Sequence, residues 1–200
     1  MAEISAAAVR ELRDKTGAGM MDCKKALSET RGDLEKAVDF LRAKGLAGAA
    51  KRTGRATHEG LVYAYIHPGG RVGVLIEVNC ESDFVARTED FNELCKDLSM
   101  HIAAAQPVSL GRDDFDAELL KRETAIFKQQ AAESGKPAEI VEKMVKGRVD
   151  KLYKERVLLE QPFVKDPSST VEDRIKAAIA KLGENINLRR FVRFQIGDDA

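Results

Sequence analysis

The feature that most constrains this fold is a pair of strand-like runs joined by a short turn. Residues 61–66 and 71–79 are rich in Val, Ile, Leu and Tyr, and His67-Pro68-Gly69-Gly70 separates them. Branched and aromatic side chains favour strands, whereas Pro and Gly favour turns, so residues 61–79 are predicted to form a β-hairpin. A hairpin alone is not stable in water, and it therefore requires a further strand or a covering helix.

A third strand is predicted at residues 186–196. Apolar residues recur there on one face, with Arg190 as the exception; they are Ile186, Leu188, Val192, Phe194 and Ile196. Alternation of this kind is typical of a strand. We therefore expect a three-stranded antiparallel sheet, one face of which must be covered by helices.

Those helices are expected within residues 88–182. A helix over 88–105 ends before Pro107 and carries apolar residues at helical spacing, namely Phe91, Leu94, Cys95, Leu98 and Ile102. Helices over about 116–132 and from Pro137 toward Tyr153 have a short connection, so they should form an antiparallel pair. The last helix ends before Gly183 and carries Val171, Ile175, Ala178, Ile179 and Leu182.

Residues 1–45 are predicted to form a separate module of three helices. Ser5 and Asp33 are favourable N-caps, and Gly45 is expected to end the third helix. Residues 46–58 are small, glycine-containing and basic, which is typical of an exposed linker. The expected fold class is therefore α+β, with a helical module at 1–45, a linker at 46–58 and a core at 59–200.

The composition predicts no long-range attraction to nucleic acid. The 33 basic and 33 acidic side chains cancel, so a partner must be recognised by local shape. Met1-Ala2-Glu3-Ile4 lacks a basic segment before an apolar run, and no apolar run is long enough to span a membrane. Cys23, Cys80 and Cys95 lack paired metal spacing and suit a reducing compartment. We therefore expect a cytoplasmic protein that does not associate with membranes.

No nucleotide-binding motif is predicted. Gly17-Ala18-Gly19-Met20-Met21-Asp22 begins like a dinucleotide fingerprint, but no strand precedes it and the third glycine is missing. A phosphate-loop pattern is also absent from the sequence. We therefore expect neither a cofactor nor a metal. Met20 and Met21 fit either a core or a soft contact surface.

The turn between the second predicted strand and the following helix contains Glu81-Ser82-Asp83-Phe84-Val85-Ala86-Arg87. Ser82 or Asp83 can N-cap a short turn there. Phe84 either turns inward and caps the core or is kept exposed for a partner, because an uncovered ring costs about 1.5 to 3 kcal/mol relative to a buried one. The sequence fits both the inward and the exposed orientation of the Phe84 ring.

The sequence contains few features that would indicate catalysis or nucleic-acid binding. His58, His67 and His101 are expected in the linker, a turn and a helix, and no hydrolase or metalloprotease motif accompanies them. A pairing of Cys80 with His101 stays open. RNA contact stays open for the basic clusters at 51–55 and 189–193. The favoured interpretation is a solvated linker for the first cluster and the polar face of a strand for the second.

Residues 77–87 resemble a signature of the bacterial elongation factor Ts family, E-[apolar]-N-x-[E/Q]-T-D-F-V-[A/S]-[K/R/N]. Ser82 replaces the usual Thr and keeps the hydroxyl. Residues 12–27 are similar to the family's other signature, and residues 158–166 and 183–197 resemble its C-terminal segments. The resemblance therefore covers nearly the whole sequence.

The resemblance implies guanine-nucleotide exchange on elongation factor Tu during translation elongation, without covalent catalysis. It assigns to the N-terminal module a fold like the ubiquitin-associated domain, which docks on the nucleotide-binding domain of the partner through Arg13, Thr16, Gly17, Met20 and Met21. It places Ser82, Asp83, Phe84 and Val85 near the partner's Mg²⁺ site, with Phe84 as a wedge. The single set of core elements resembles the family's short form, for which a homodimer is expected. The alternative is a nucleic-acid-binding or adaptor module without exchange activity.

Overall fold

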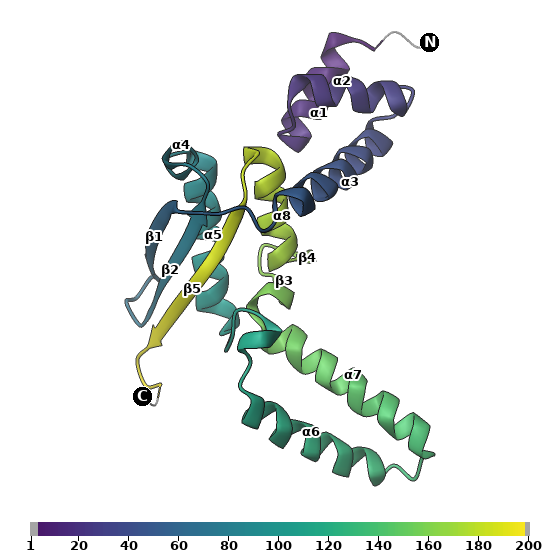
Figure 1. The fold of residues 1–200 in the computed structure, drawn as a ribbon, viewed down its shortest axis with the longest axis vertical. Helices are drawn as coiled ribbons and strands as arrows, with labels where there is room; N and C mark the ends of the chain where they lie inside the picture. Colours follow the sequence, from purple (N-terminus) through teal and green to yellow (C-terminus); the bar gives the residue numbers. More distant parts are fainter. Residues whose placement is uncertain (1–3, 199–200) are drawn as a thin grey trace. The chain divides into compact units, whose positions relative to one another are not determined.

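The chain contains helices and a three-stranded sheet, which confirms the α+β class (Figure 1). The computed structural model describes residues 4–198. Residues 1–3 and 199–200, which were assigned to the predicted module and core, lie outside the described residues. The elements are α1 (Ala6–Thr16), α2 (Met20–Glu29), α3 (Leu34–Arg52), β1 (Glu59–Ile66), β2 (Val72–Cys80), α4 (Asp83–Ala86), α5 (Glu89–Ala105), α6 (Ala117–Ala132), α7 (Ala138–Arg156), β3 (Pro162–Phe163), β4 (Asp166–Thr170), α8 (Val171–Leu182) and β5 (Ile186–Gln195), with 3₁₀ turns at Arg112–Asp114 and Leu158–Glu160.

The sheet has the strand order β1-β2-β5, as the hairpin and the third strand predict. In the hairpin, the backbone N–H of His67 donates to Val72, and the turn is closed by Gly69 and Gly70, both at positive φ. Between β2 and β5, Arg190 pairs with Glu77 while Ile196 donates to Arg71. Residue numbers therefore rise along β2 as they fall along β5, so this pair is antiparallel.

The first three helices enclose their own small core. Ser5 caps α1 by accepting a hydrogen bond from Ala8 at 3.1 Å, and Asp33 caps α3 by accepting one from Lys36 at 3.0 Å. The buried residues of this core are Val9, Leu12, Cys23, Ala26, Leu27, Ala37 and Leu41. The prediction of three helices with these two caps is confirmed.

The prediction that the third helix ends at Gly45 is wrong, because α3 continues to Arg52. Glycine inside a helix costs only about 1 kcal/mol relative to Ala, and the alanines around it favour the helix. A Cβ added at Gly45 would lie 3.0 Å from the Cβ of Ala180, so the glycine permits a close approach to α8. Much of the expected linker at 46–58 is thus helical, and only residues 53–58 join α3 to β1.

The chain divides into two compact units. One contains the residues up to Leu61 together with Asn79–Leu94 and Ile175–Asn187, and the other contains Val62–Val78, Cys95–Arg174 and the residues from Leu188 onward. The three N-terminal helices therefore share a unit with the segments around α4 and the second part of α8. The division into domains at 1–45, 46–58 and 59–200 stays a prediction.

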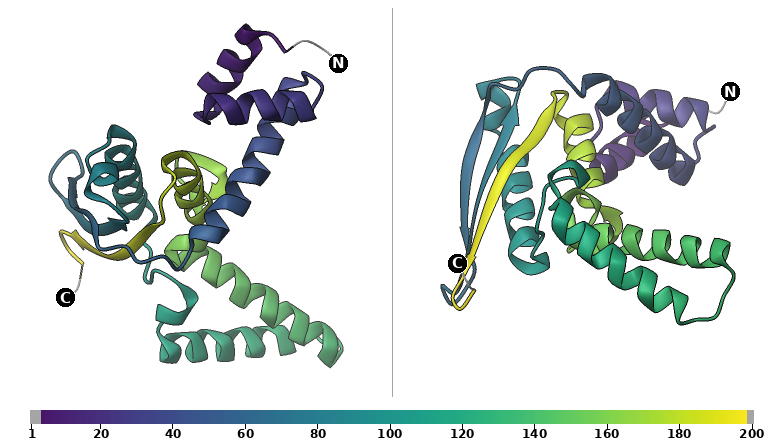
Figure 2. Two further views of the ribbon diagram at one scale, coloured as in Figure 1. Left: turned by 45° about the horizontal axis from the view of Figure 1, so that its top comes forward. Right: turned by 60° about the horizontal axis from the view of Figure 1, so that its bottom comes forward.

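The helices after the hairpin follow the predicted periodicity. The expected apolar face of α5 is fully buried along its length, at Phe91, Leu94, Cys95, Leu98 and Ile102. Figures 1 and 2 show α6 and α7 side by side and antiparallel, as expected from their short connection. Pro137 is the N-cap of α7 and not a residue of its first turn.

Arg112 fixes the base of the α6–α7 pair. Its guanidinium donates two hydrogen bonds to Glu160, at 2.5 and 2.7 Å, and lies 3.4 Å from a carboxylate oxygen of Asp150. It also stacks over the ring of Tyr153 at 4.3 Å. Hydrogen bonding to the guanidinium lowers the pKa of Glu160. A bidentate pair of this kind sets an orientation that a single point charge would not.

The short strands β3 and β4 were not predicted. They pair Pro162 with Thr170 and Phe163 with Asp166 in an irregular antiparallel register. A strand of two residues is too short to show alternation, and the Pro and Ser residues of this segment are typical of loops. Buried Asp97 of α5 pairs with Lys165 of this segment at 2.6 Å and with Arg174 of α8 at 3.1 Å.

The apolar alternation of β5 does not produce one buried face. Ile186 and Leu188 are buried, but Val192, Phe194 and Ile196 are 40%, 70% and 60% exposed. On the opposite side of the strand, the nearly buried side chain of Arg193 donates to the carbonyl of Ala103 at the end of α5. Among residues 4–198, no helix is long and apolar enough to cross a membrane.

A buried histidine connects α5 to β3. The ring of His101 is fully buried, its Nδ1 accepts a hydrogen bond from the backbone N–H of Val164 at 3.1 Å, and its Nε2 lies 2.9 Å from Oε1 of Gln161. Because Nδ1 accepts, the neutral ring carries its proton on Nε2 and donates to Gln161. Burial lowers the pKa of His101 from its ordinary value of 6.5.

This depressed pKa predicts a pH-dependent stability. The unfolded chain takes up a proton at His101 below pH 6.5, whereas the folded chain resists it. The contribution of His101 to the free energy of unfolding should therefore be complete above pH 6.5. As the pH decreases below 6.5, the free energy of unfolding should decrease by up to about 1.4 kcal/mol per pH unit, until the pH passes the folded-state pKa. Urea midpoints between about pH 7.5 and 5.5 measure this dependence.

His101→Asn keeps an acceptor for Val164 and removes the titration, so its midpoint should vary less with pH than that of the wild type. His58→Asn, at an exposed histidine before β1, is the matched control and should keep the wild-type dependence. Equal pH dependence in the wild type and His101→Asn would contradict the assignment.

Candidate partner-binding site

The site begins where β2 ends and a single helical turn follows. Ser82 is the N-cap of α4, with an extended backbone at φ −132°, and its Oγ accepts from the N–H of Val85 at 3.4 Å. Thr88 closes the other end by donating to the carbonyl of Val85 at 2.7 Å and accepting from Phe91 at 3.2 Å. The predicted turn at this corner is confirmed, and of the two candidate caps, Ser82 and Asp83, Ser82 is the one that caps it.

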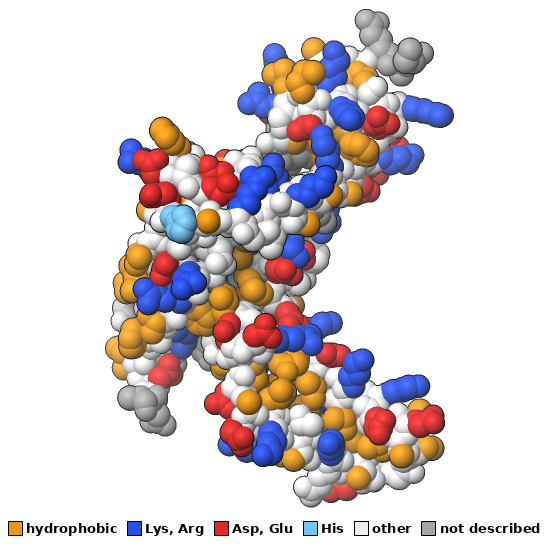
Figure 3. Space-filling model, viewed as in Figure 1, with side chains coloured by type: hydrophobic (Ala, Val, Ile, Leu, Met, Phe, Trp, Pro, Cys, Tyr) orange, Lys and Arg blue, Asp and Glu red, His pale blue; other side chains and the backbone are white. Residues whose placement is uncertain are grey.

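Phe84 does not cap the core. Its side chain is 80% exposed, while Ala86 of the same turn is buried and Val85 is half-buried. In Figure 3 a hydrophobic group stands out from the surface in the region of α4. Leaving a ring in water costs about 1.5 to 3 kcal/mol relative to burying it, so this arrangement does not serve the stability of the free protein.

The corner carries a charge beside the ring. Oδ2 of Asp83 pairs with the guanidinium of Arg87 at 2.8 Å, one helical turn along α4, and both side chains are more than one-third exposed. Exposed pairs of this type contribute little to stability, about 0 to 1 kcal/mol. The carboxylate of Asp83 can therefore exchange Arg87 for another positive group at small cost.

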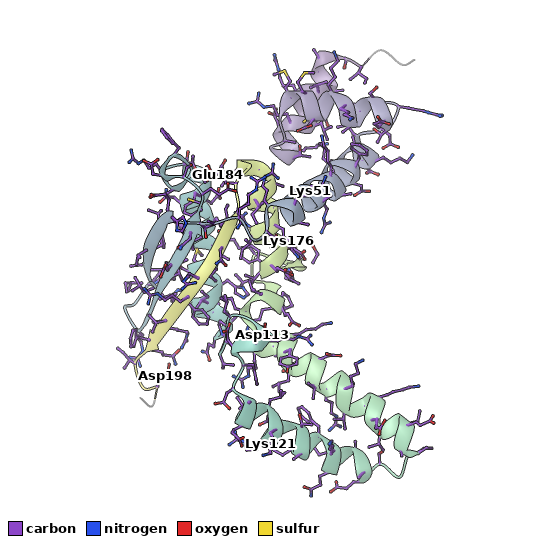
Figure 4. All side chains as sticks on the ribbon, viewed as in Figure 1. Lys51, Asp113, Lys121, Lys176, Glu184 and Asp198 are labelled. Atoms are coloured by element: carbon purple, nitrogen blue, oxygen red, sulfur yellow. The ribbon has the colours of Figure 1, made fainter. Side chains whose placement is uncertain are left out.

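The carboxylate of Glu184, in the connection that follows α8, holds the corner by accepting hydrogen bonds from it. Oε2 of Glu184 accepts hydrogen bonds from the backbone N–H groups of Glu81 at 3.1 Å and Ser82 at 3.0 Å. Its Oε1 accepts from the hydroxyl of Ser82 at 2.6 Å. Figure 4 labels Glu184 just after α8, next to the turn that leads into α4. Three donors on one carboxylate make a strong, directional contact.

A second set of hydrogen bonds joins the same segments, with Glu81 of the corner as an acceptor. The side chain of Glu81 accepts from the backbone N–H of Asn185 at 2.6 Å and pairs with Arg55 at 3.5 Å. The side-chain amide of Asn185 donates to the carbonyl of Arg55 at 2.8 Å. The segments before α4, after α8 and after α3 are thus tied together within one compact unit.

The other predicted residues lie on α1 and α2. Met20 and Met21 are 60% and 77% exposed, so they are not core residues and form a soft apolar surface at the start of α2. Arg13 is exposed near the end of α1. Thr16 donates to the carbonyl of Leu12 at 2.7 Å and accepts from Ala18, which shapes the connection to α2.

The structure explains why residue 17 is a glycine. It ends α1 in the left-handed conformation, at φ +65°, which disfavours other residues. A Cβ added there would lie 3.2 Å from Cε of Lys181 on α8. The ammonium of Lys181 pairs with Asp90, at the start of α5, at 2.7 Å.

The pairing of Cys80 with His101, which the sequence leaves open, does not form. The thiol of Cys80 donates to the carbonyl of Ser82 at 3.1 Å, and His101 is engaged with Gln161 and Val164. Burial, followed by the charge of Glu184, raises the pKa of Cys80 to about 11, which is the opposite of what a nucleophile requires. Over the described part of the chain, no three His, Cys, Asp or Glu residues group as a metal site would require.

The comparisons with known proteins agree with the two signatures. A family model described as Elongation factor TS matches residues 48–197. Elongation factor Ts from Heliobacterium modesticaldum is 58% identical over 195 residues, which cover 98% of this chain and 91% of that protein. Elongation factor Ts from Moorella thermoacetica is also 58% identical over 195 residues, with 98% and 96% covered. The chain belongs to the elongation factor Ts family.

Membership of the elongation factor Ts family confirms the resemblance drawn from the signatures. Residues 77–87 lie inside the matched range, and residues 12–27 precede it but lie within the 98% of the chain that the relatives cover. Glu184 was the residue that sequence reasoning missed. Its segment was noted as similar to the family, but nothing in the spacing indicates that it contacts a corner about one hundred residues away.

The raised pKa of Cys80 predicts an unreactive thiol. At about pH 8, three units below its pKa, only about one thiol in a thousand is ionised. Iodoacetamide should therefore label Cys80 slowly in the native protein and rapidly in urea. Mass spectrometry of the peptide that contains Cys80 measures the modified fraction.

Cys23 and Cys95 are also buried, and they serve as internal controls for access of the reagent. Rapid labelling of native Cys80 alone would contradict the environment described here.

Proposed function

We propose that this protein is a guanine-nucleotide exchange factor for elongation factor Tu. The observation that carries the proposal is the exposed ring of Phe84, held on a turn with a defined cap and external hydrogen bonds. A large exposed aromatic residue at a fixed position is suited to insertion into a partner, because such residues provide most of the binding energy at protein interfaces. Membership of the elongation factor Ts family identifies the partner class.

The exchange needs no covalent chemistry. A guanine nucleotide bound with nanomolar affinity is held by about 12 kcal/mol, so its spontaneous release is slow. A protein that binds the nucleotide-free state preferentially lowers nucleotide affinity, and rebinding of a nucleotide expels that protein by the same linkage. The factor therefore needs only contacts that differ between the two states of the partner.

Within this scheme the four corner residues have separate roles. Phe84 enters between partner side chains near the Mg²⁺ site, and removal of its ring from water supplies the differential binding energy. Asp83 leaves Arg87 and meets the partner, where its charge disturbs the surroundings of the metal. Ser82 and Val85 hold the turn, as their cap hydrogen bond supports.

The N-terminal helices provide the docking surface. We infer a fold like the ubiquitin-associated domain for α1 to α3, and we place its contact with the nucleotide-binding domain of elongation factor Tu on Arg13, Thr16, Gly17, Met20 and Met21. The exposure of both methionines supports this role, since Met adapts its shape to a partner. We also infer a cytoplasmic location, where translation takes place.

A nucleic-acid or adaptor function has weaker support. The net charge is zero, and Arg190 and Arg193 of the second basic cluster are already engaged with Glu77 and with Ala103 and Asp198. A binding mode that depends on phosphate contacts would also lose affinity steeply with salt. Protein recognition through local shape fits these observations better.

Phe84→Ala tests the wedge. Because the ring is 80% exposed, its removal should leave the urea midpoint unchanged. The stimulated release of fluorescent GDP from purified elongation factor Tu should fall about thirtyfold, which corresponds to about 2 kcal/mol for truncation of a central aromatic contact. Stopped-flow fluorescence measures the rate.

Val164→Ala removes another exposed apolar side chain and should release GDP at the wild-type rate. Undiminished exchange by Phe84→Ala would reject the wedge, and a wild-type protein that does not accelerate release would reject the proposed function.

We further infer a homodimer formed through the outer sheet face, defined by Val62, Ile66, Leu75, Val192, Phe194 and Ile196. All six side chains are at least 40% exposed. Arg190 and Glu77 form an ion pair across two strands of this face, and Figure 3 shows hydrophobic side chains gathered over it. Monomeric proteins seldom leave such a patch in water, and two sheets can pack face to face through it. A second copy would supply an equivalent face about a two-fold axis.

Phe194→Asp tests this dimer. The side chain is 70% exposed, so a charge there should not disturb folding, but it would be desolvated in the dimer. Light scattering after size exclusion should give twice the 22.0 kDa chain mass for the wild type and the single mass for the variant.

Ile140→Asp, on α7, is the control and should stay dimeric. A wild type with the mass of one chain at all concentrations would contradict the homodimer.

A further inference from the structure

We propose that Glu184 is a positioning residue for the Phe84 corner. This inference rests on the proposed function, because it assigns to the segment after α8 the task of holding the binding turn in its competent conformation. Glu184 does not belong to the corner in sequence and is separated from Ser82 by more than one hundred residues. Nevertheless it accepts three hydrogen bonds from that turn, two from backbone and one from a side chain.

The corner cannot hold this conformation by itself. The helix α4 contains only four residues, and a single turn is not stable without external contacts because nucleation is unfavourable. Its own cap bond, from Val85 to Ser82, is long at 3.4 Å. The N–H groups of Glu81 and Ser82 precede the helix and have no carbonyl within it to bond. Glu184 supplies the acceptor for both.

Glu184 is itself held in place. The next residue, Asn185, donates its backbone N–H to Glu81 and its side-chain amide to the carbonyl of Arg55. One turn earlier on α8, Lys181 pairs with Asp90 at the start of α5. Contacts therefore hold the chain both before Glu184, at Lys181, and after it, at Asn185. The carboxylate of Glu184 meets its three donors in a fixed geometry.

Fixing the turn matters because Phe84 is exposed. Without external bonds, the turn can rearrange and let the ring collapse onto its own subunit, since burial of apolar surface is favourable. A partner then binds only the fraction of molecules in which the ring is still presented, and the apparent affinity falls by that fraction. Glu184 thus affects affinity without touching the partner.

Two substitutions separate the hydrogen bonds from the charge. Glu184→Ala removes all three acceptor contacts. Glu184→Gln keeps a carbonyl oxygen for the two backbone donors, and its NH₂ group can donate to the hydroxyl of Ser82, which accepts as well as donates. Glu139→Ala, at an exposed glutamate on α7, is the matched control for loss of one carboxylate.

The experiment measures the stimulated release of fluorescent GDP from elongation factor Tu over a range of factor concentrations. For Glu184→Ala, the half-saturating concentration should rise about tenfold, as expected if only about a tenth of the molecules present the turn correctly. The rate at saturation should stay near wild type. Glu184→Gln and Glu139→Ala should behave like wild type in both quantities.

Amide hydrogen exchange gives a readout without a partner. In Glu184→Ala, the amides of Glu81 and Ser82 should exchange faster, while the amides of α5 keep their protection and serve as an internal control for folding. If Glu184→Ala does not fold, Ser82→Ala removes one of the three bonds to Glu184 together with the 3.4 Å cap bond from Val85, and should also raise the half-saturating concentration.

The outcomes distinguish the two proposals. If Phe84→Ala slows exchange but Glu184→Ala has the wild-type half-saturating concentration, the positioning role is wrong and the proposed function stands. If Glu184→Gln is as impaired as Glu184→Ala, charge and not hydrogen bonding is responsible, which also overturns the positioning role. If the wild type itself does not accelerate GDP release, the proposed function fails, whatever the amide exchange shows.

Discussion

The conformation of the Phe84 corner depends on two backbone N–H groups that donate hydrogen bonds to the carboxylate of Glu184, about one hundred residues away. A strand that passes directly into a helix must leave donors unpaired at the junction, and here the donors of Glu81 and Ser82 are satisfied by Glu184. The hydroxyl of Ser82 joins the same group. Because the backbone is fixed in this way, the side chain of Phe84 can remain outside the core even though burial would be favourable.

The same carboxylate influences the chemistry beneath the turn. Its negative charge adds to burial in raising the pKa of Cys80, whose thiol donates to the carbonyl of Ser82. From sequence alone, a catalytic pairing of Cys80, at the end of a strand, with His101 stays open. The environment instead keeps Cys80 protonated, so the thiol acts as a small buried donor that contributes to the geometry of the corner.

Local patterns predicted most elements, and the errors have physical causes. The hairpin, the caps at Ser5, Ser82 and Asp33, and the buried face of α5 all depend on neighbours in sequence, which periodicity and turn chemistry describe. The exposure of Phe84 cannot be predicted from its neighbours in sequence, because it depends on whether Ala86 or the ring fills the space below the turn. The contacts of Glu184, Asp97 and Arg112 join residues far apart in the chain, and no spacing rule identifies them. The end of the third helix is mispredicted because glycine commonly ends a helix, whereas Gly45 lies inside α3 and allows close packing against Ala180.

The continuity of α3 has a consequence for association. A chain of glycine and small polar residues would leave the three-helix module free to sample many orientations, and a partner that engages the module and the corner together would have to restrict that freedom. Instead α3 contributes Ala37 and Leu41 to the core of the module and extends unbroken to the contact of Gly45 with α8. This contact restricts the rotation of the module in the free protein, so a partner that engaged the module and the corner together would meet them in a preorganised arrangement.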